Sequence, residues 1–187
     1  MIGLSEAAEA RMEETLALAA AGDAVAFAAI VREHQAMVFS LAYHFLHDRC
    51  VAEDVAQEVF IRLYQKIGDI ESPAHLKHWL RKVASHRSLD HARARRGGTE
   101  VSLDDVSELA GAPEERDPLL GEKLRRLVAS LPQQARMVIV LRYQEELEYH
   151  EIAEVMEIPI NTVKSNLQRA LAVLRGKLVR TMGDVPV

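Results

Sequence analysis

The residues with the clearest chemical capacity are cations near the C-terminus. Residues 158–180, IPINTVKSNLQRALAVLRGKLVR, contain five Lys or Arg side chains and no acidic residue, although the whole chain has a formal net charge of -5. Cations attract nucleic-acid phosphates, and amide, hydroxyl and guanidinium groups read base edges in the major groove. This segment therefore predicts a nucleic-acid surface. A solvated helical hairpin with a few surface cations is the plainer alternative.

A second cationic segment precedes an acidic one. Residues 75–97 hold seven Lys or Arg side chains against Asp90 alone, and residues 98–118 hold seven acidic side chains against Arg116 alone. The acidic stretch also contains Gly and Pro residues that break regular structure, so we predict a flexible acidic linker there. Two basic surfaces thus flank an acidic tether, and the overall charge conceals both of them.

Composition favours helices in the rest of the chain. Hydrophobic residues make up 49% of the sequence and aromatic residues only 5%, while Ala, Leu, Glu and Arg abound. Apolar residues recur at helical spacing, and helix start signals occur at Ser5, Asp23, Asp48 and Ser72 followed by Pro73. These patterns predict an all-α protein. Its two small helical domains would be residues 1–97 and 119–182, joined by the linker of residues 98–118.

The cysteine count and the N-terminal charges bear on the cellular compartment. Cys50 has no partner for an internal disulfide, which is typical of a protein in a reducing cytoplasm. The apolar stretch LALAAAGDAVAFAAIV follows four glutamates where a signal peptide has cations, and Asp23 interrupts it. We therefore expect a cytoplasmic protein without membrane insertion.

The C-terminal basic segment belongs to a two-helix pattern. EYHEIAEVMEIPINTVKSNLQRALAVLR indicates a short helix, a tight connection at EIP and a second helix at roughly 161–174, whose start is set by Pro159 and the cap candidates Asn161 and Thr162. The inward stripe of that second helix consists of Val163, Leu167, Ala170, Leu171 and Leu174. Its opposite side presents Lys164, Ser165, Gln168 and Arg169. This is the pattern of a helix-turn-helix, whose second helix enters the major groove of DNA.

Longer strings resemble a known family. LPQQARMVIVLRYQEELEYHEIAEVMEIPINTVKSNLQRALAVLR resembles region 4 of the sigma-70 family, especially its small extracytoplasmic-function (group 4) members. AEDVAQEVFIRLYQKI, followed by HWLRKVASHRSLDHARARR, resembles region 2 of the same family. The two resemblances occur in the expected order and cover most of residues 23–180. They imply a sigma factor, which lends promoter specificity to bacterial RNA polymerase core enzyme and assists promoter opening.

The resemblance also implies three sets of contact residues. The duplex -35 element would contact Thr162, Lys164, Ser165, Asn166, Gln168 and Arg169. The single-stranded -10 element would contact Lys82, His86, Arg87, His91, Arg93 and Arg96. Core polymerase would bind Asp54, Gln57, Glu58 and Phe60, and an anti-sigma factor is a further implied partner. His86 stands where the family commonly has Asn and Asn166 where it often has Arg, so base preference at these positions does not transfer from relatives.

Other classes of function explain the sequence less completely. Asp54, Gln57 and Glu58 would look the same on a merely solvated helix face, and a phenylalanine such as Phe60 more often lies in a core. Four histidines between residues 75 and 91 lack cysteine partners and lie among cations, so we expect no metal and no cofactor. The chain has no nucleophile motif, Gly-rich phosphate loop or HExxH string, so we expect no enzyme. A dimeric helix-turn-helix regulator with a helical sensing domain is the main alternative, and a protein-binding adaptor is a third.

Overall fold

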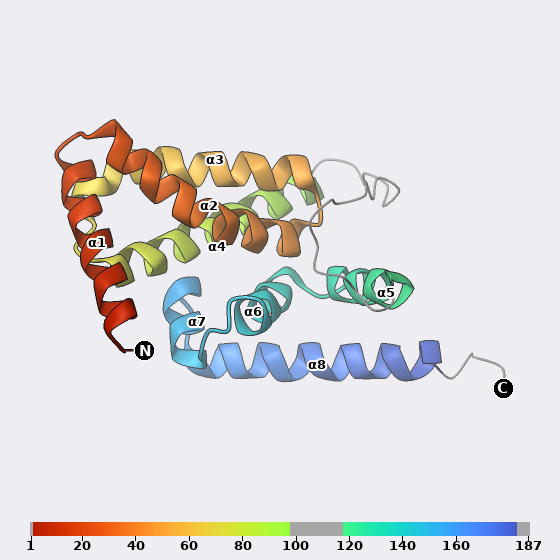
Figure 1. The fold of residues 1–187 in the computed structure, drawn as a ribbon. Helices are drawn as coiled ribbons and strands as arrows, with labels where there is room; N and C mark the ends of the chain where they lie inside the picture. The colour runs from red at the N-terminus through yellow and green to blue at the C-terminus, as the bar shows by residue number, and fades with distance from the viewer. Residues whose placement is uncertain (1, 98–117, 183–187) are drawn as a thin grey trace.

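The computed structural model describes residues 2–97 and 118–182 as an assembly of helices (Figure 1). The first range contains α1 (Ile2–Ala20), α2 (Ala24–Leu46), α3 (Arg49–Lys66), the 3-10 turn η1 (Ile67–Asp69) and α4 (Pro73–Gly97). The second range contains α5 (Pro118–Ala129), α6 (Gln133–Tyr143), α7 (Tyr149–Met156) and α8 (Ile160–Met182). Neither range contains a strand, so the all-α prediction is confirmed for them. The predicted linker lies outside the described residues, except for Pro118, which begins α5.

Three of the four predicted helix starts in the first range are found, whereas α1 begins at Ile2, so that Ser5 lies inside this helix and does not start it. Asp23 Oδ1 accepts hydrogen bonds from the amides of Val25 and Ala26, at 2.7 and 3.0 Å. Asp48 and Ser72 act in the same way for α3 and α4, because each side-chain oxygen accepts from the amide three residues later at 3.1 Å. These bonds satisfy amide groups that have no partner within a helix. The start signals at these three residues are confirmed.

The start of α8 agrees with the predicted signal at Pro159 but not with the two cap candidates. The helix begins at Ile160, and the Pro159 carbonyl oxygen accepts from the amides of Thr162 and Val163, at 2.8 and 3.2 Å. Asn161 and Thr162 therefore lie inside the first turn, and neither caps it. Proline fixes its own φ at about -65°, which is compatible with an early helix start, and this restraint outweighs the two polar cap candidates.

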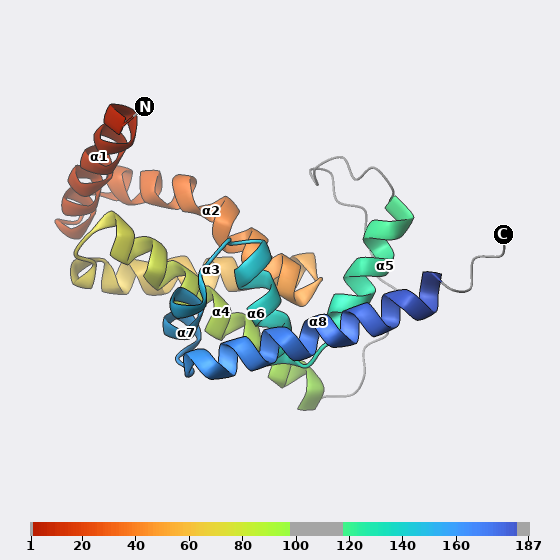
Figure 2. The same cartoon turned by 90° about the horizontal axis from the view of Figure 1, so that it is seen from below.

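Helix α2 lies at the centre of the first bundle and contacts α1, α3 and α4 (Figures 1 and 2). The bundle core is aliphatic apart from one large aromatic ring. Its side chains without exposed surface include Ile30, Val38, Leu41, Phe45, Leu63, Leu76 and Leu80. By length and composition α2 is also apolar enough to cross a membrane. In this fold, however, its buried stripe is the core of the bundle.

Helix α6 has the corresponding place in the second bundle, because nearly all of its apolar side chains are buried. Helices α7 and α8 pack against α6, and α5 contacts α8. Four positions of the predicted inward stripe of α8 are buried, namely Val163, Leu167, Ala170 and Leu174. Leu171 is only partly buried against the core. The stripe is therefore confirmed at four of its five positions.

The two bundles contact each other through α4 with α6 and α7, and through α2 with α6. In Figure 1, α6 and α7 lie between the first bundle and α8, so the outer side of α8 faces away from the first bundle. The Arg136 guanidinium donates to the Phe45 carbonyl oxygen at 3.1 Å and lies 5.4 Å from the centre of the Phe45 ring. Gln144 Nε2 donates to Ser40 Oγ at 3.4 Å. Both contacts join a residue of the second bundle to α2.

Candidate nucleic-acid interface

The turn between α7 and α8 is tight because Glu157 adopts a left-handed conformation, with a φ of 54°. Its amide donates to the carbonyl oxygens of Ala153 and Glu154, and the amide of Ile158 donates to that of Ala153 at 3.1 Å. These bonds end α7 and redirect the chain within residues 157–159. The predicted helix-turn-helix is therefore present, with α8 as its second helix.

The outer face of α8 carries most of the residues predicted to contact the -35 element. Lys164, Gln168 and Arg169 are exposed, and Thr162 and Ser165 are half-buried beside them. Arg169 Nε donates to the Ser165 carbonyl oxygen at 3.2 Å, and Arg169 Nη2 donates to Ser165 Oγ at 3.1 Å. The guanidinium thus lies along its own helix. The face is open to solvent, polar and cationic, as a surface for the major groove must be.

Asn166 lies on the inner side of α8 instead. Its side chain is buried, and its Nδ2 has no hydrogen-bond partner among the described residues. It follows Val163 by three residues and precedes Ala170 by four, so helical geometry places all three on one face. The structure therefore does not bring Asn166 to the exposed face with the other five residues. The burial of Asn166 could have been predicted from the sequence by extending the spacing of the apolar stripe to residue 166.

The cations of α4 are paired with carboxylates of the same bundle along the C-terminal half of the helix. Arg87 and Arg93 both contact Asp90, at 2.8 and 3.1 Å. His91 Nε2 donates to Glu58 Oε1 of α3 at 3.1 Å. These contacts give Arg87, Arg93 and His91 carboxylate partners within the first bundle. The α4 strip denotes the six residues of this helix that are predicted to contact the -10 element. The side chain of Arg96, the last predicted member of this strip, lies outside the described residues.

The N-terminal half of the α4 strip is paired with the second bundle. Three contacts form this junction: Arg81 Nε donates to Glu145 Oε2 at 3.0 Å, Lys82 Nζ donates to Glu157 Oε1 at 2.8 Å, and His86 Nε2 donates to the Val155 carbonyl oxygen at 3.2 Å. The hydrogen bond from Lys82 lowers the pKa of the Glu157 carboxyl, and the positive charge of Lys82 adds to this shift. Sequence reasoning missed both glutamates, because nothing in the chain pattern says which loop carboxylates meet α4.

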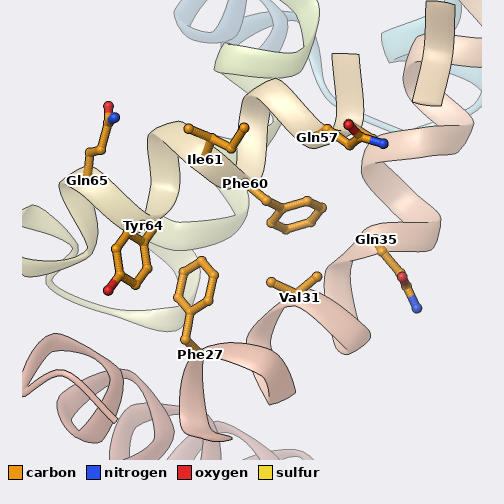
Figure 3. Close-up of a pocket in the computed structure, with 9 residues that line it drawn as sticks. Phe27, Val31, Gln35, Gln57, Phe60, Ile61, Tyr64 and Gln65 are labelled. Carbon is orange, nitrogen blue, oxygen red and sulfur yellow. The ribbon is translucent and has the colours of Figure 1, made fainter. Parts of the chain in front are cut away.

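A groove of about 550 Å³ lies between α2 and α3 (Figure 3). Phe60 points from α3 towards Val31 of α2, and the rings of Phe27 and Tyr64 meet edge to face with centres 5.2 Å apart. Gln35, Ala56, Gln57, Ile61 and Gln65 complete the lining. The groove has an apolar floor and an amide-rich rim, which suits the side of another protein's helix.

The four predicted core-binding residues fall on two sides of α3. Gln57 and Phe60 line the groove, and the exposed Asp54 precedes Gln57 by about one helical turn. Glu58 is turned towards α4, where it accepts from His91. Sequence reasoning missed Ile61 and Tyr64, although their exposed fractions of 59% and 64% mark them as an unusual apolar surface. Both residues lie outside the buried stripe of α3, and this spacing in the sequence could have indicated that they are exposed.

Two family models match the chain, one for each bundle. The model described as Sigma-70 region 2 matches residues 30–97, from α2 to the end of α4. The model described as Sigma-70, region 4 matches residues 121–174, from α5 into α8. The match to region 2 begins after α1.

Among the described residues, no group of three or more His, Cys, Asp or Glu side chains is placed to hold a metal ion.

Similar solved structures share the fold. The structure of CnrH in complex with the cytosolic domain of CnrY has a TM-score of 0.65 and 22% identity, and the match covers 89% of this chain and 96% of that one. The sigma factor RpoE in complex with the anti-sigma factor NepR, from Bartonella quintana, also has a TM-score of 0.65, with 20% identity over 81% of this chain and 96% of that one.

Curated relatives are similar over most of their length. The ECF RNA polymerase sigma factor SigW of Bacillus subtilis strain 168 is 33% identical over 171 residues, which cover 84% of this chain and 91% of that protein. The ECF RNA polymerase sigma-E factor of Escherichia coli strain K12 is 32% identical over 172 residues, which cover 84% and 88%. With both regions matched in order and relatives above 30% identity, the chain belongs to the sigma-70 family and, within it, to the extracytoplasmic-function sigma factors.

Proposed function

We propose that this protein binds the core enzyme of bacterial RNA polymerase, directs it to specific promoters and assists promoter opening. The observation that carries the proposal is the presence of both sigma-70 regions, in order, on two bundles that each carry a cationic surface. A regulatory role and a cytoplasmic location beside the polymerase follow from family membership, so we expect no enzymatic activity of the chain itself. The domain limits of 1–97, 98–118 and 119–182 belong to the same proposal.

The duplex -35 element is assigned to the outer face of α8. Five of the six predicted residues support this assignment by their position: Thr162, Lys164, Ser165, Gln168 and Arg169. A helix with side chains is narrow enough for the major groove, and mixed amide, hydroxyl and cationic groups reach both base edges and phosphates. Asn166 packs beneath this face, so we propose that it supports the helix and does not contact DNA directly.

The single-stranded -10 element is assigned to the α4 strip, which comprises Lys82, His86, Arg87, His91, Arg93 and Arg96. Phosphates would replace the carboxylates that Lys82, Arg87 and Arg93 contact in the free protein, and captured bases would offset the loss of stacking in the duplex. Opening DNA in this way needs binding energy only. The imidazole of His86 can stack on a base and donate a hydrogen bond, which suits the position that the resemblance gives it.

The groove of α2 and α3 is assigned to the polymerase. Phe60 supplies apolar surface at its floor, and Gln57 and Asp54 supply polar contacts at its edge. Ile61 and Tyr64 extend this apolar surface, and Glu58 would have to exchange its contact with His91 for one with polymerase. An anti-sigma factor is a further proposed partner, since one of the two similar solved structures is a complex with such a protein.

Transcription in vitro with purified core polymerase and a library of genomic fragments tests the function. We expect transcripts from a small set of promoters that share -10 and -35 sequences, and only when the protein is present. Absence of protein-dependent initiation with active core enzyme would contradict the proposal. The alternative of a dimeric regulator predicts something different, namely a stable homodimer in gel filtration that binds palindromic duplex DNA without polymerase.

A further inference from the structure

Two cations of the second bundle lie over the ring of Tyr149, the first residue of α7. The Arg142 guanidinium of α6 is 5.4 Å from the centre of the ring, and the Lys164 ammonium of α8 is 6.0 Å from it. A cation at such a distance is attracted by the electron-rich face of an aromatic ring. Lys164 is assigned to the -35 element, so Tyr149 links the first helix of the helix-turn-helix to a contact residue on the second.

The position of the Tyr149 ring is fixed by the chain around it. The ring is half-buried against the core of the second bundle. Arg142 Nη1 donates to the Leu147 carbonyl oxygen at 2.8 Å and to Glu148 Oε1 at 2.9 Å. The amide of Glu148 donates to Glu151 Oε2 at 2.7 Å. Several contacts at once therefore hold the start of α7, and the ring has a firm support.

The two cations differ in what balances their charge. Arg142 forms an ion pair with Glu148 at 2.9 Å, which compensates its charge. In the ranges that the structure describes, no carboxylate lies within ion-pair distance of Lys164, and the ring is the group that attracts its ammonium. An ammonium has three N–H donors, so one that lies over a ring on one side still has donors on the other side for a phosphate or a base.

Holding this ammonium in advance lowers the entropy cost of a DNA contact. Lysine has one of the largest rotamer freedoms of all side chains, and a contact with DNA must restrict it. A side chain that is already held near its bound position loses less freedom on binding. Arg169, the other cation assigned to the -35 element, is held in a comparable way by Ser165. Both cations of this face are thus ordered before DNA binds.

From these contacts we propose that Tyr149 is a positioning residue for recognition of the -35 element, because the face of its ring holds the Lys164 ammonium in the place from which it contacts DNA. The inference rests on the proposed assignment of the outer face of α8 to that element. Tyr149 acts through Lys164, so its contribution to DNA binding should vanish when Lys164 is absent. A tyrosine that only supports α7 would contribute equally with and without Lys164.

The test is a double-mutant cycle in the full-length chain. Tyr149→Leu removes the ring and keeps apolar bulk, Tyr149→Phe keeps the ring and removes only the hydroxyl, and each is combined with Lys164→Ala. Tyr143→Leu is the matched control, since Tyr143 is 60% exposed at the end of α6 and no cation of the described residues lies over its ring. Circular dichroism confirms that each variant is folded. The affinity measured is that of holoenzyme for a fluorescein-labelled promoter duplex from the transcription library.

We expect Tyr149→Leu to weaken this affinity by about two- to fivefold, the range that an exposed cation–π contact supports. The same substitution should not change the affinity of the Lys164→Ala variant, whereas Tyr143→Leu should have one and the same effect in both backgrounds. Tyr149→Phe should keep close to wild-type affinity, because the face of the ring is retained. Equal effects of Tyr149→Leu with and without Lys164, including no effect in either background, overturn the proposal.

A second measurement needs no DNA. In the NMR spectrum of the free protein, the ring current of Tyr149 should shift the ε-methylene protons of Lys164 to lower frequency, and Lys164→Ala identifies their signal by its loss. The shift should persist in Tyr149→Phe and disappear in Tyr149→Leu. If the signal has the same frequency in wild type and Tyr149→Leu, the ring does not hold Lys164 and the proposal is wrong.

Failure of the positioning role is distinguishable from failure of the proposed function. Transcription by wild-type protein with core enzyme tests the function and does not depend on the result of the cycle. If transcription is normal and the two substitutions are additive, only the role of Tyr149 is wrong. If active core enzyme transcribes no promoter with this protein, the assignment to the -35 element falls, and the positioning role falls with it.

Discussion

Two substitutions on the outer face of α8, Lys164→Ala and Arg169→Ala, test the assignment to the -35 element. Both side chains are exposed, so neither substitution should disturb the core. The two residues are five positions apart, or about 7.5 Å along the helix axis at 1.5 Å per residue. At 3.6 residues per turn the two side chains also point about 140° apart, so they can contact different groups of the duplex.

The size of the effect depends on what each cation contacts. A bidentate contact to a base is worth about 1–3 kcal/mol, so its loss weakens binding by about 5- to 150-fold at the cognate site. A contact to phosphate changes the salt dependence instead, because the slope of log affinity against log salt falls by about 0.9 for each lost contact. Between about 50 and 200 mM salt, wild type should then lose about 3.5-fold more affinity than the variant.

Arg169 has an additional cost before it can reach DNA. Its two hydrogen bonds to Ser165 must be exchanged for contacts to the promoter. Because both bonds are exposed, water can replace them and the exchange should cost less than about 1 kcal/mol. Arg169→Ala should therefore weaken DNA binding slightly less than the loss of an arginine that makes no such hydrogen bonds in the free protein.

The assay measures holoenzyme affinity for a promoter duplex obtained from the transcription library, at several salt concentrations. Arg175→Ala is the matched control, since Arg175 is exposed on the same helix but 11 residues beyond Lys164. Circular dichroism confirms that each variant is folded. If both variants match the control in affinity and in salt slope, α8 does not read the -35 element through these residues.

Three further predictions concern polymerase binding, pH and packing. Asp54→Arg with Glu58→Arg should abolish co-purification with core polymerase at unchanged helicity, whereas the same reversals at Glu13 and Glu14 of α1 should not; equal recovery of both double variants would remove the assignment. Burial lowers the pKa of His34 from its ordinary 6.5, the charges of Lys77 and Arg81 add to this shift, and Glu33 opposes it. The neutral His34 should not affect the pH dependence of stability above pH 6.5. Below that value the unfolded chain takes up the proton first, so the free energy of unfolding should fall as the pH falls. If the melting temperatures of wild type and His34→Gln run parallel across this range, this reasoning is wrong. Leu41→Ala, at a fully buried position, should lower the free energy of unfolding by about 2–5 kcal/mol in urea titration, and a loss below about 1 kcal/mol would show that this core is loosely packed.

Features with a local cause could be predicted from the sequence. Asp23, Asp48 and Ser72 cap helices because each side chain needs only an amide two or three residues away, and that distance is fixed by the chain itself. The all-α class, the helix-turn-helix and the exposed position of Lys164 follow from helical periodicity for the same reason. Asn166 is buried, as its spacing from Val163 and Ala170 indicates, and its predicted contact with the -35 element rested on the resemblance to relatives and not on that spacing.

Features with a distant cause could not be predicted. Nothing in the local sequence shows that Glu145 contacts Arg81, 64 residues away, or that Glu157 contacts Lys82, 75 residues away. Such pairs depend on how two finished bundles dock, and many exposed carboxylates satisfy the same charge rule. The groove of α2 and α3 has the same character, because Phe27 and Tyr64 become neighbours only after both helices pack.

During synthesis, α4 is made before the residues of α7 that it contacts in the finished fold. The first bundle leaves the ribosome before its counterpart exists, since about 60 residues separate Gly97 from Glu157. At about 5–20 residues per second, translation leaves α4 without that glutamate for roughly 3–12 s. In this interval the nascent bundle presents its cations to messenger and ribosomal RNA. The first carboxylates to follow α4 out of the ribosome are the seven acidic residues of 98–118, so the growing chain supplies its own counter-charges early.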